Sequence, residues 1–152
     1  MSVFITSSSS QFGRRRGWLA ATVLWTLQIA AAAMFLFAGS HKLNAAPEMV
    51  ATFEVIGLGQ WFRYMTGAIE VVAAIALLVP RAAVFGALLL VPTMVGAVVT
   101  HLVIGGSIVP AVVLLGVTAF IAWARREDLL RVAAALQAAT IGPGEAAIGE
   151  VR

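Results

Sequence analysis

Long apolar segments recur along this chain and restrict the folds that it can adopt. The first, residues 17–38, reads GWLAATVLWTLQIAAAAMFLFA, and residues 60–79, 82–104 and 107–124 are similarly apolar. An α-helix needs about 20 apolar residues to cross the hydrocarbon core of a bilayer. Only 11% of the residues are charged, whereas soluble domains carry about 25%. The sequence therefore predicts an all-α fold, a four-helix transmembrane bundle in the lipid bilayer.

The polar segments divide the chain into three parts. Residues 1–16 are expected to form a disordered basic leader, 17–124 the membrane domain, and 125–152 a cytoplasmic tail with a short amphipathic helix. A basic segment before an apolar run also resembles a signal peptide, but this run continues past the alanines at 30–33, which favours a retained span. In the long connection after it, Pro47 can open a short helix on the membrane surface.

The placement of basic residues predicts the orientation. Cytoplasmic loops of membrane proteins carry an excess of lysine and arginine. With both termini inside the cell membrane, the outer face keeps only Lys42 and Arg63, and the inner face collects the other basic residues. We therefore expect an inner-membrane protein with both termini cytoplasmic. The net charge of +3 then reflects topology, and no nucleic-acid partner is expected. The residues on the predicted inner face are Arg14, Arg15, Arg16, Arg81, Arg125, Arg126, Arg131 and Arg152.

Several kinds of chemistry are excluded or unsupported. The chain has no cysteine, so it cannot form disulfides, thiolate metal sites or cysteine-ligated iron–sulfur clusters. Its sequence contains no nucleophile–base pair, P-loop or dinucleotide-binding motif. The sequence therefore does not predict a stand-alone enzyme, and it assigns no catalytic residue and no metal.

Glu70 is the most unusual residue, because it lies near the middle of the second apolar segment. An ionisable residue at that depth costs about 2.5–3.5 kcal/mol to insert and normally faces the interior of the bundle. Counting depth along each span places Gln28 at the same level, so Gln28 is the expected partner, with Thr93 second. Without a nearby cation the carboxyl is expected to be neutral, and it could then bind a quinone carbonyl or relay a proton. Alternatively, it fixes helix register.

A second polar layer is expected at the outer end of the bundle. It includes His41 and Lys42 after the first span, Arg63 and Thr66 in the second, and His101 in the third. Arg63 and Glu70 lie two helical turns apart, about 10 Å, so a direct pair is not expected. A haem or metal between His41 and His101 would require the first and third spans to be close. Such residues are also ordinary interfacial anchors. The candidate ligand-binding residues are Glu70, His101, Lys42, His41, Arg63, Gln28 and Thr66.

Three segments resemble the DoxX-like membrane proteins: FLFAGSHKL, RYMTGAIEVVAAIALLVP and GALLLVPTMVGAVVTHL. The resemblance implies a four-helix membrane bundle. It also implies a link to terminal oxidases, thiosulfate:quinone oxidoreductases and an oxidative-stress complex, although thiol or haem chemistry would need ligands that this cysteine-free chain supplies poorly. The recurrent family positions fall on Gly39, Lys42, Leu43, Gly67, Glu70, Pro80, Met94 and His101.

Three functions are therefore compatible with the sequence. The first is a redox-associated subunit that binds a quinone or another small apolar ligand between Glu70 and His101. The second is a non-enzymatic membrane scaffold that binds a protein partner, such as a membrane redox protein, through its outer loop or basic tail. The third is a small proton-coupled transporter, in which case four spans would have to form a homo-oligomer to enclose a path.

Overall fold

The computed structural model describes residues 8–140, with side chains described for residues 18–139. This part of the chain forms helices and contains no strand, which confirms the all-α prediction. The helices are α1 (Ser8–Leu43), α2 (Pro47–Ile56), α3 (Gln60–Leu77), α4 (Ala83–Ile104), α5 (Val109–Ala124) and α6 (Arg126–Thr140).

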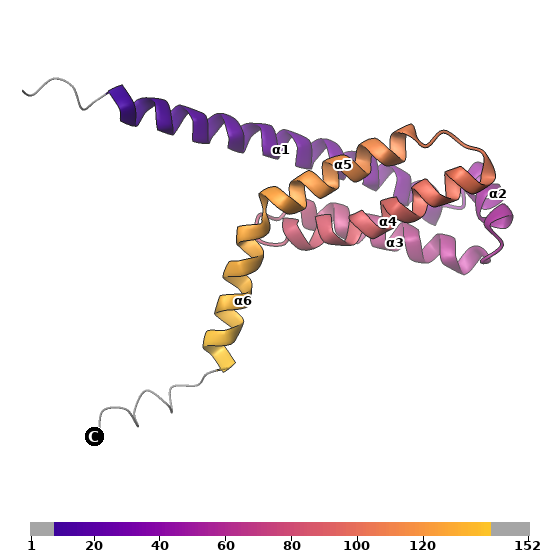
Figure 1. The fold of residues 1–152 in the computed structure, drawn as a ribbon. Coiled ribbons are helices and arrows are strands. Elements are labelled where there is room, and N and C mark those ends of the chain that lie inside the picture. Colours follow the sequence, from indigo (N-terminus) through magenta and orange to yellow (C-terminus); the bar gives the residue numbers. More distant parts are fainter. Residues whose placement is uncertain (1–7, 141–152) are drawn as a thin grey trace, which may run out of the picture.

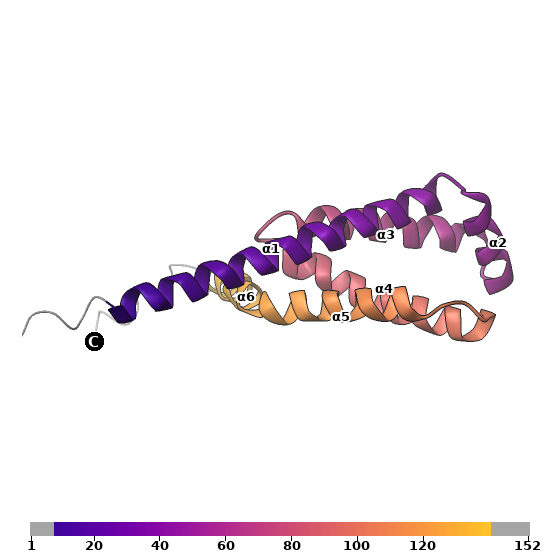
Figure 2. The same cartoon turned by 90° about the horizontal axis from the view of Figure 1, so that it is seen from above.

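The four long helices form two layers (Figure 2). One layer consists of α1 and α3, the other of α4 and α5, and α3 packs against α4 to join them. The short helix α2 lies across one end of the bundle, and α6 leaves the other end at 49° to α5 (Figure 1). We call these the α2 end and the α6 end. At the α6 end, α1 extends beyond the other helices (Figure 1).

Small side chains allow the helices to pack closely. Ala31, Ala73, Ala74 and Ala87 are buried in the core beside larger residues such as Phe35. Close backbone approach is the usual way in which membrane helices associate, because lipid offers no hydrophobic driving force between them.

Two helical segments are long and apolar enough to cross a membrane by themselves: residues 18–43 of α1 and helix α4. A third qualifies only if α5 and α6 are taken together as one bent span. Helix α5 has only 16 residues, and the first half of α3 contains Gln60, Arg63 and Thr66. The described residues thus contain two candidate spans, or up to three.

The helix boundaries differ from the predicted ones at two places. Helix α1 begins at Ser8, so residues 8–16, which we expected in a disordered leader, are helical; residues 1–7 and 141–152 lie outside the described residues. Helix α5 begins at Val109, two residues after the start of the apolar segment at 107, and its N-cap residue Ile108 makes no side-chain capping bond. The helix opened by Pro47 and the tail helix both form, as α2 and α6.

Candidate functional site

Glu70 and Lys42 form a buried ion pair between α3 and α1. The Lys42 ammonium (Nζ) donates to both carboxylate oxygens of Glu70, at 2.7 Å to Oε1 and 2.6 Å to Oε2. The Glu70 side chain is 2% exposed and the Lys42 side chain 15%. Two predicted site residues are therefore direct partners.

Two glycines bring these charged residues together. A Cβ atom added to Gly39 of α1 would lie 2.9 Å from the carbonyl oxygen of Gly67, and one added to Gly67 would lie 2.9 Å from the Cβ of Lys42. Lys42 and Glu70 each follow one of these glycines by three residues. Side chains lean toward the N-terminus of their own helix, so on antiparallel helices both side chains lean back to the glycine crossing and meet there.

Arg63 adds a second cation to this end of the bundle. The residue is 2% exposed, and its Nη1 donates to the backbone carbonyl of Lys42. Its Nε donates to Gln60 Oε1 at 2.6 Å, and Gln60 Nε2 donates to the carbonyl of Val50 in α2 at 3.2 Å. Arg63 thus ties the end of α1 to α3 and, through Gln60, to α2. We call Lys42, Glu70, Arg63 and Gln60 the α2-end cluster.

Two other polar side chains that we expected near Glu70 lie outside the ion pair. The Thr66 hydroxyl donates to carbonyls of its own helix, those of Phe62 and Arg63. The predicted secondary partner of Glu70, Thr93, is partly buried and donates to the carbonyl of Leu89 in its own helix, so that assignment was wrong.

The helices that carry His41 and His101, α1 and α4, do not pack against each other in the described part of the chain. The closeness of the first and third spans that a haem or metal between the two histidines would require is therefore not observed. His41 lies 3.4 Å from Glu48, whose pKa is lowered first by its own backbone N–H in the first turn of α2 and then by His41. The described residues contain no group of three potential metal ligands among histidine, aspartate and glutamate.

His101 is also distant from Glu70. A Cβ atom on Gly86 would touch backbone atoms of Ala73 and Leu77, which fixes the register of α4 against α3. Counting 1.5 Å per residue from this contact places His101 roughly 12 Å or more beyond Glu70 along the axis. The ring of His101 packs instead against Gly106, and its Nδ1 atom is buried without a hydrogen-bond partner.

Gln28 belongs to a different cluster, at the α6 end. Its Nε2 donates to the carbonyl of Leu77 at 2.7 Å, and its Oε1 accepts from Arg125 Nη2 at 2.8 Å. Arg125 also lies 3.5 Å from Asp128. We call Gln28, Arg125 and Asp128 the α6-end cluster. The predicted Gln28–Glu70 contact was wrong: Leu77 is seven residues from Glu70, about 10 Å along α3.

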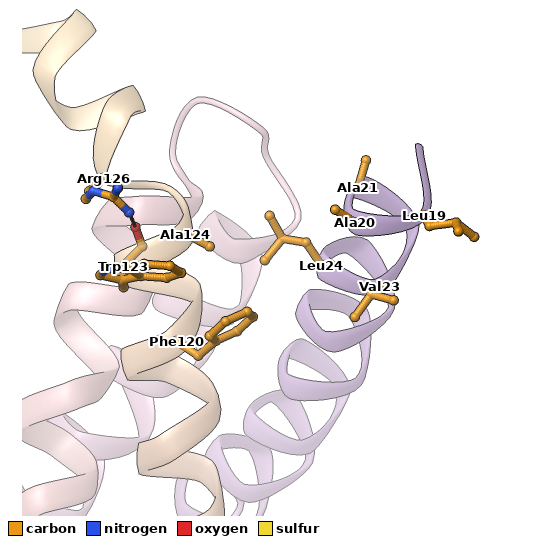
Figure 3. A pocket seen from close by; sticks show the side chains of 9 residues that line it. All are labelled: Leu19, Ala20, Ala21, Val23, Leu24, Phe120, Trp123, Ala124 and Arg126. Carbon is orange, nitrogen blue, oxygen red and sulfur yellow. Dashed lines mark hydrogen bonds between the residues drawn. The ribbon is translucent and has the colours of Figure 1, made fainter. Parts of the chain in front are cut away.

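An open groove also lies at the α6 end, between α1 and α5 (Figure 3). Leu24 and Phe120 extend into the space between the two helices, and Arg126 lies near the start of α6. Lys42 is 18 residues further along α1 than Leu24, or about 27 Å. The groove is therefore separate from the Lys42–Glu70 pair.

Sequence reasoning missed Arg125 and Gln60 as members of these clusters. Arg125 was assigned only to the positive inner face, although an arginine directly after an apolar segment can reach back into the bundle. For Gln60, the signal was its position one turn before Arg63 on the same face of α3.

The comparisons with known proteins identify a family. A model of the DoxX-like family matches residues 26–125, which include the glycine crossing and the ion pair. No curated protein matches the chain, and no solved structure does. The chain belongs to the DoxX-like family of membrane proteins.

Proposed function

We propose that this protein is a four-span, non-enzymatic scaffold of the cell membrane, with both termini in the cytoplasm. The observation that carries the proposal is the pairing of both Glu70 oxygens with Lys42. A carboxylate that is 2% exposed and bound on both oxygens by its own chain is arranged to hold helices together. It does not present a free acid to a quinone.

The direction of the polar side chains supports α3 as a membrane span. Arg63 and Glu70 are both buried against neighbouring helices, so their charge does not face lipid. The outward surface of α3 is apolar and includes Met65, Val72 and Ile75, which are 40–60% exposed. The 18 residues of α3 cover about 27 Å, close to the roughly 30 Å hydrocarbon core.

The connections between helices support the orientation. The turn between α3 and α4 contains Arg81, and the junction of α5 and α6 contains Arg125 and Arg126. If each of the four long helices crosses the membrane, these arginines share one side, as the positive-inside rule requires. The exposed tail helix α6 then lies on the cytoplasmic side, where it can bind a partner protein or the membrane surface.

Cysteine labelling tests the topology without removing any native residue of that type, since the chain has none. Single variants Leu58→Cys, Arg81→Cys and Ala138→Cys report on the α2–α3 loop, the α3–α4 turn and α6. A membrane-impermeant maleimide should label Leu58→Cys on intact cells or spheroplasts, and the other two only after permeabilisation. Labelling of Arg81→Cys from outside would contradict four spans with cytoplasmic termini.

Native mass spectrometry with lipid extraction tests the scaffold role against the ligand-binding role. The purified wild type and Glu70→Gln are compared, with Glu54→Gln as the control because Glu54 is an exposed carboxylate of α2. The scaffold proposal expects no small molecule whose retention depends on Glu70. A quinone retained by the wild type and by Glu54→Gln but lost from Glu70→Gln would overturn it.

A further inference from the structure

The groove between α1 and α5 has a volume of about 610 Å³, within the usual range for sites that bind small molecules. Its walls are apolar and include Leu19 and Leu24 of α1 and Phe120 and Trp123 of α5. Alanines face it from both helices, among them Ala20 and Ala124. Because an alanine contributes only a methyl group, the space between the helices is left open.

One residue that lines the groove, Arg126, is an arginine without an acidic partner among the described side chains. The guanidinium of Arg126 donates to the carbonyl of Trp123 at 2.9 Å (Figure 3) and lies 4.7 Å from the centre of the Trp123 ring. In the part of the chain with described side chains, Arg126 contacts no carboxylate, whereas its neighbour Arg125 pairs with Asp128. The charge of Arg126 is therefore available to an anion at the mouth of the groove.

The basic residues of the sequence concentrate at the same end of the bundle. Among the described side chains, the charged ones at this end are the basic Arg81, Arg125, Arg126 and Arg131 and the acidic Glu127 and Asp128. Arg125 follows α5 directly. Basic residues thus outnumber acidic ones near the groove, and basic pockets between membrane helices favour anionic headgroups.

We propose that this groove binds one anionic phospholipid, with an acyl chain between α1 and α5 and the phosphate at Arg126. The lining supplies an apolar surface for the chain. The guanidinium of Arg126, which contacts no carboxylate among the described side chains, supplies a hydrogen-bonding cation for the phosphate. A neutral quinone would use the apolar walls but not the charge. This inference rests on the membrane placement of α1 and α5 in the proposed function.

The length of α5 supports the same occupant. Its 16 residues span about 24 Å, less than the roughly 30 Å of a hydrocarbon core. The arginines after α5 can therefore lie below the level of the surrounding headgroups, and such a mismatch is relieved by local thinning of the bilayer. A phosphate bound to Arg126 then lies at the depth that the short helix α5 sets.

Lipid titration by native mass spectrometry tests the proposal. The full-length protein is purified in detergent and titrated with phosphatidylglycerol or phosphatidylcholine carrying identical acyl chains. Wild type should bind one phosphatidylglycerol more tightly than phosphatidylcholine. Arg126→Gln should weaken phosphatidylglycerol binding about fivefold, the effect of one basic residue near a membrane surface. It should weaken phosphatidylcholine binding less, because the choline cation of that lipid offsets the charge of its phosphate.

Two further variants keep the test specific. Arg81→Gln makes the same change of charge at the exposed α3–α4 turn, outside the groove, and should have little effect. Ala124→Leu fills the groove and should weaken the binding of both lipids. Equal losses for Arg81→Gln and Arg126→Gln would mean unspecific attraction to net charge and would overturn the proposal.

A quinone competition completes the test. Displacement of phosphatidylglycerol by ubiquinone, with quinone binding insensitive to Arg126→Gln, would also overturn the proposal, because the groove would then select a neutral ligand. The cysteine labelling described above decides the topology separately. A protein with the proposed topology and no preference for phosphatidylglycerol would therefore contradict only the lipid site.

Discussion

The two ends of the bundle use buried polar residues in different ways. At the α2 end, Lys42 and Glu70 form a charged pair that is almost fully enclosed, with side chains 15% and 2% exposed. At the α6 end, Gln28 is fully buried but is a neutral amide, and its partner Arg125 is shared with Asp128, whose side chain is 25% exposed. The cations of the two ends are similarly enclosed, since the Arg125 side chain is 16% exposed, but the carboxylate at the α6 end is much more exposed than Glu70.

This difference follows from how closely α1 approaches α3 at the α2 end and α5 at the α6 end. At the α2 end, Gly39 and Gly67 let the backbones of α1 and α3 touch, and the charged side chains close over the crossing. At the α6 end, α1 separates from α5 and leaves the groove open. A tight crossing can enclose a charged pair, whereas a loose seam leaves space for a lipid. The contacts at the α2 end should therefore contribute more to the free energy of unfolding than those at the α6 end.

The largest effect is expected from breaking the ion pair one partner at a time. Removing one partner of a buried pair costs about 3–5 kcal/mol, because the other charge is left without compensation. Lys42→Met should lower the free energy of unfolding more than Glu70→Met. Lys42→Met leaves the charge of Glu70, the more buried partner, whereas Glu70→Met leaves Lys42, which lies at a helix end and can extend toward water. Equilibrium unfolding in mixed micelles measures both variants.

The double variant Lys42→Met/Glu70→Met provides the matched test of this prediction. Replacing a buried pair by apolar residues of similar size is often neutral or stabilising, so the double variant should be more stable than either single variant. A double variant as unstable as the sum of the single changes would show that the two charges are not coupled. The α2-end cluster would then not be the main restraint on α1 and α3.

The next effect concerns the glycine crossing itself. Gly39→Ala would place a methyl group 2.8 Å from Val71 Cγ2 and 2.9 Å from the Gly67 carbonyl, and overpacking of this kind costs about 1–3 kcal/mol. Gly116→Ala is the control, because a Cβ atom added at Gly116 would meet open space; it should be neutral or stabilising by up to about 1 kcal/mol. The same unfolding assay compares them, and equal stabilities would contradict a close crossing.

Much of the fold could be predicted from the sequence, because apolar runs, prolines and glycines mark the helices locally. The site was predicted only in part. Lys42 and Glu70 were both selected as candidates, but Glu70 was paired with Gln28 by counting depth from the middle of each span. The register of α1 against α3 depends instead on the glycine crossing, which is a contact between distant parts of the chain. Local patterns do not determine such a contact.

The smallest effect on stability is expected from a substitution of Gln28, the buried amide of the α6-end cluster. Gln28→Leu removes hydrogen bonds to the Leu77 carbonyl and from Arg125. Leaving buried polar groups unsatisfied costs about 1–3 kcal/mol, and the lower half of that range is expected because Arg125 keeps Asp128 as a partner. Thr118→Val is the matched control, since this buried hydroxyl bonds only to carbonyls of its own helix and should cost less.

If Gln28→Leu destabilises the protein as much as Lys42→Met, the α6 end is as strong a restraint as the α2 end. The open groove would then have to be explained by something other than a loose seam.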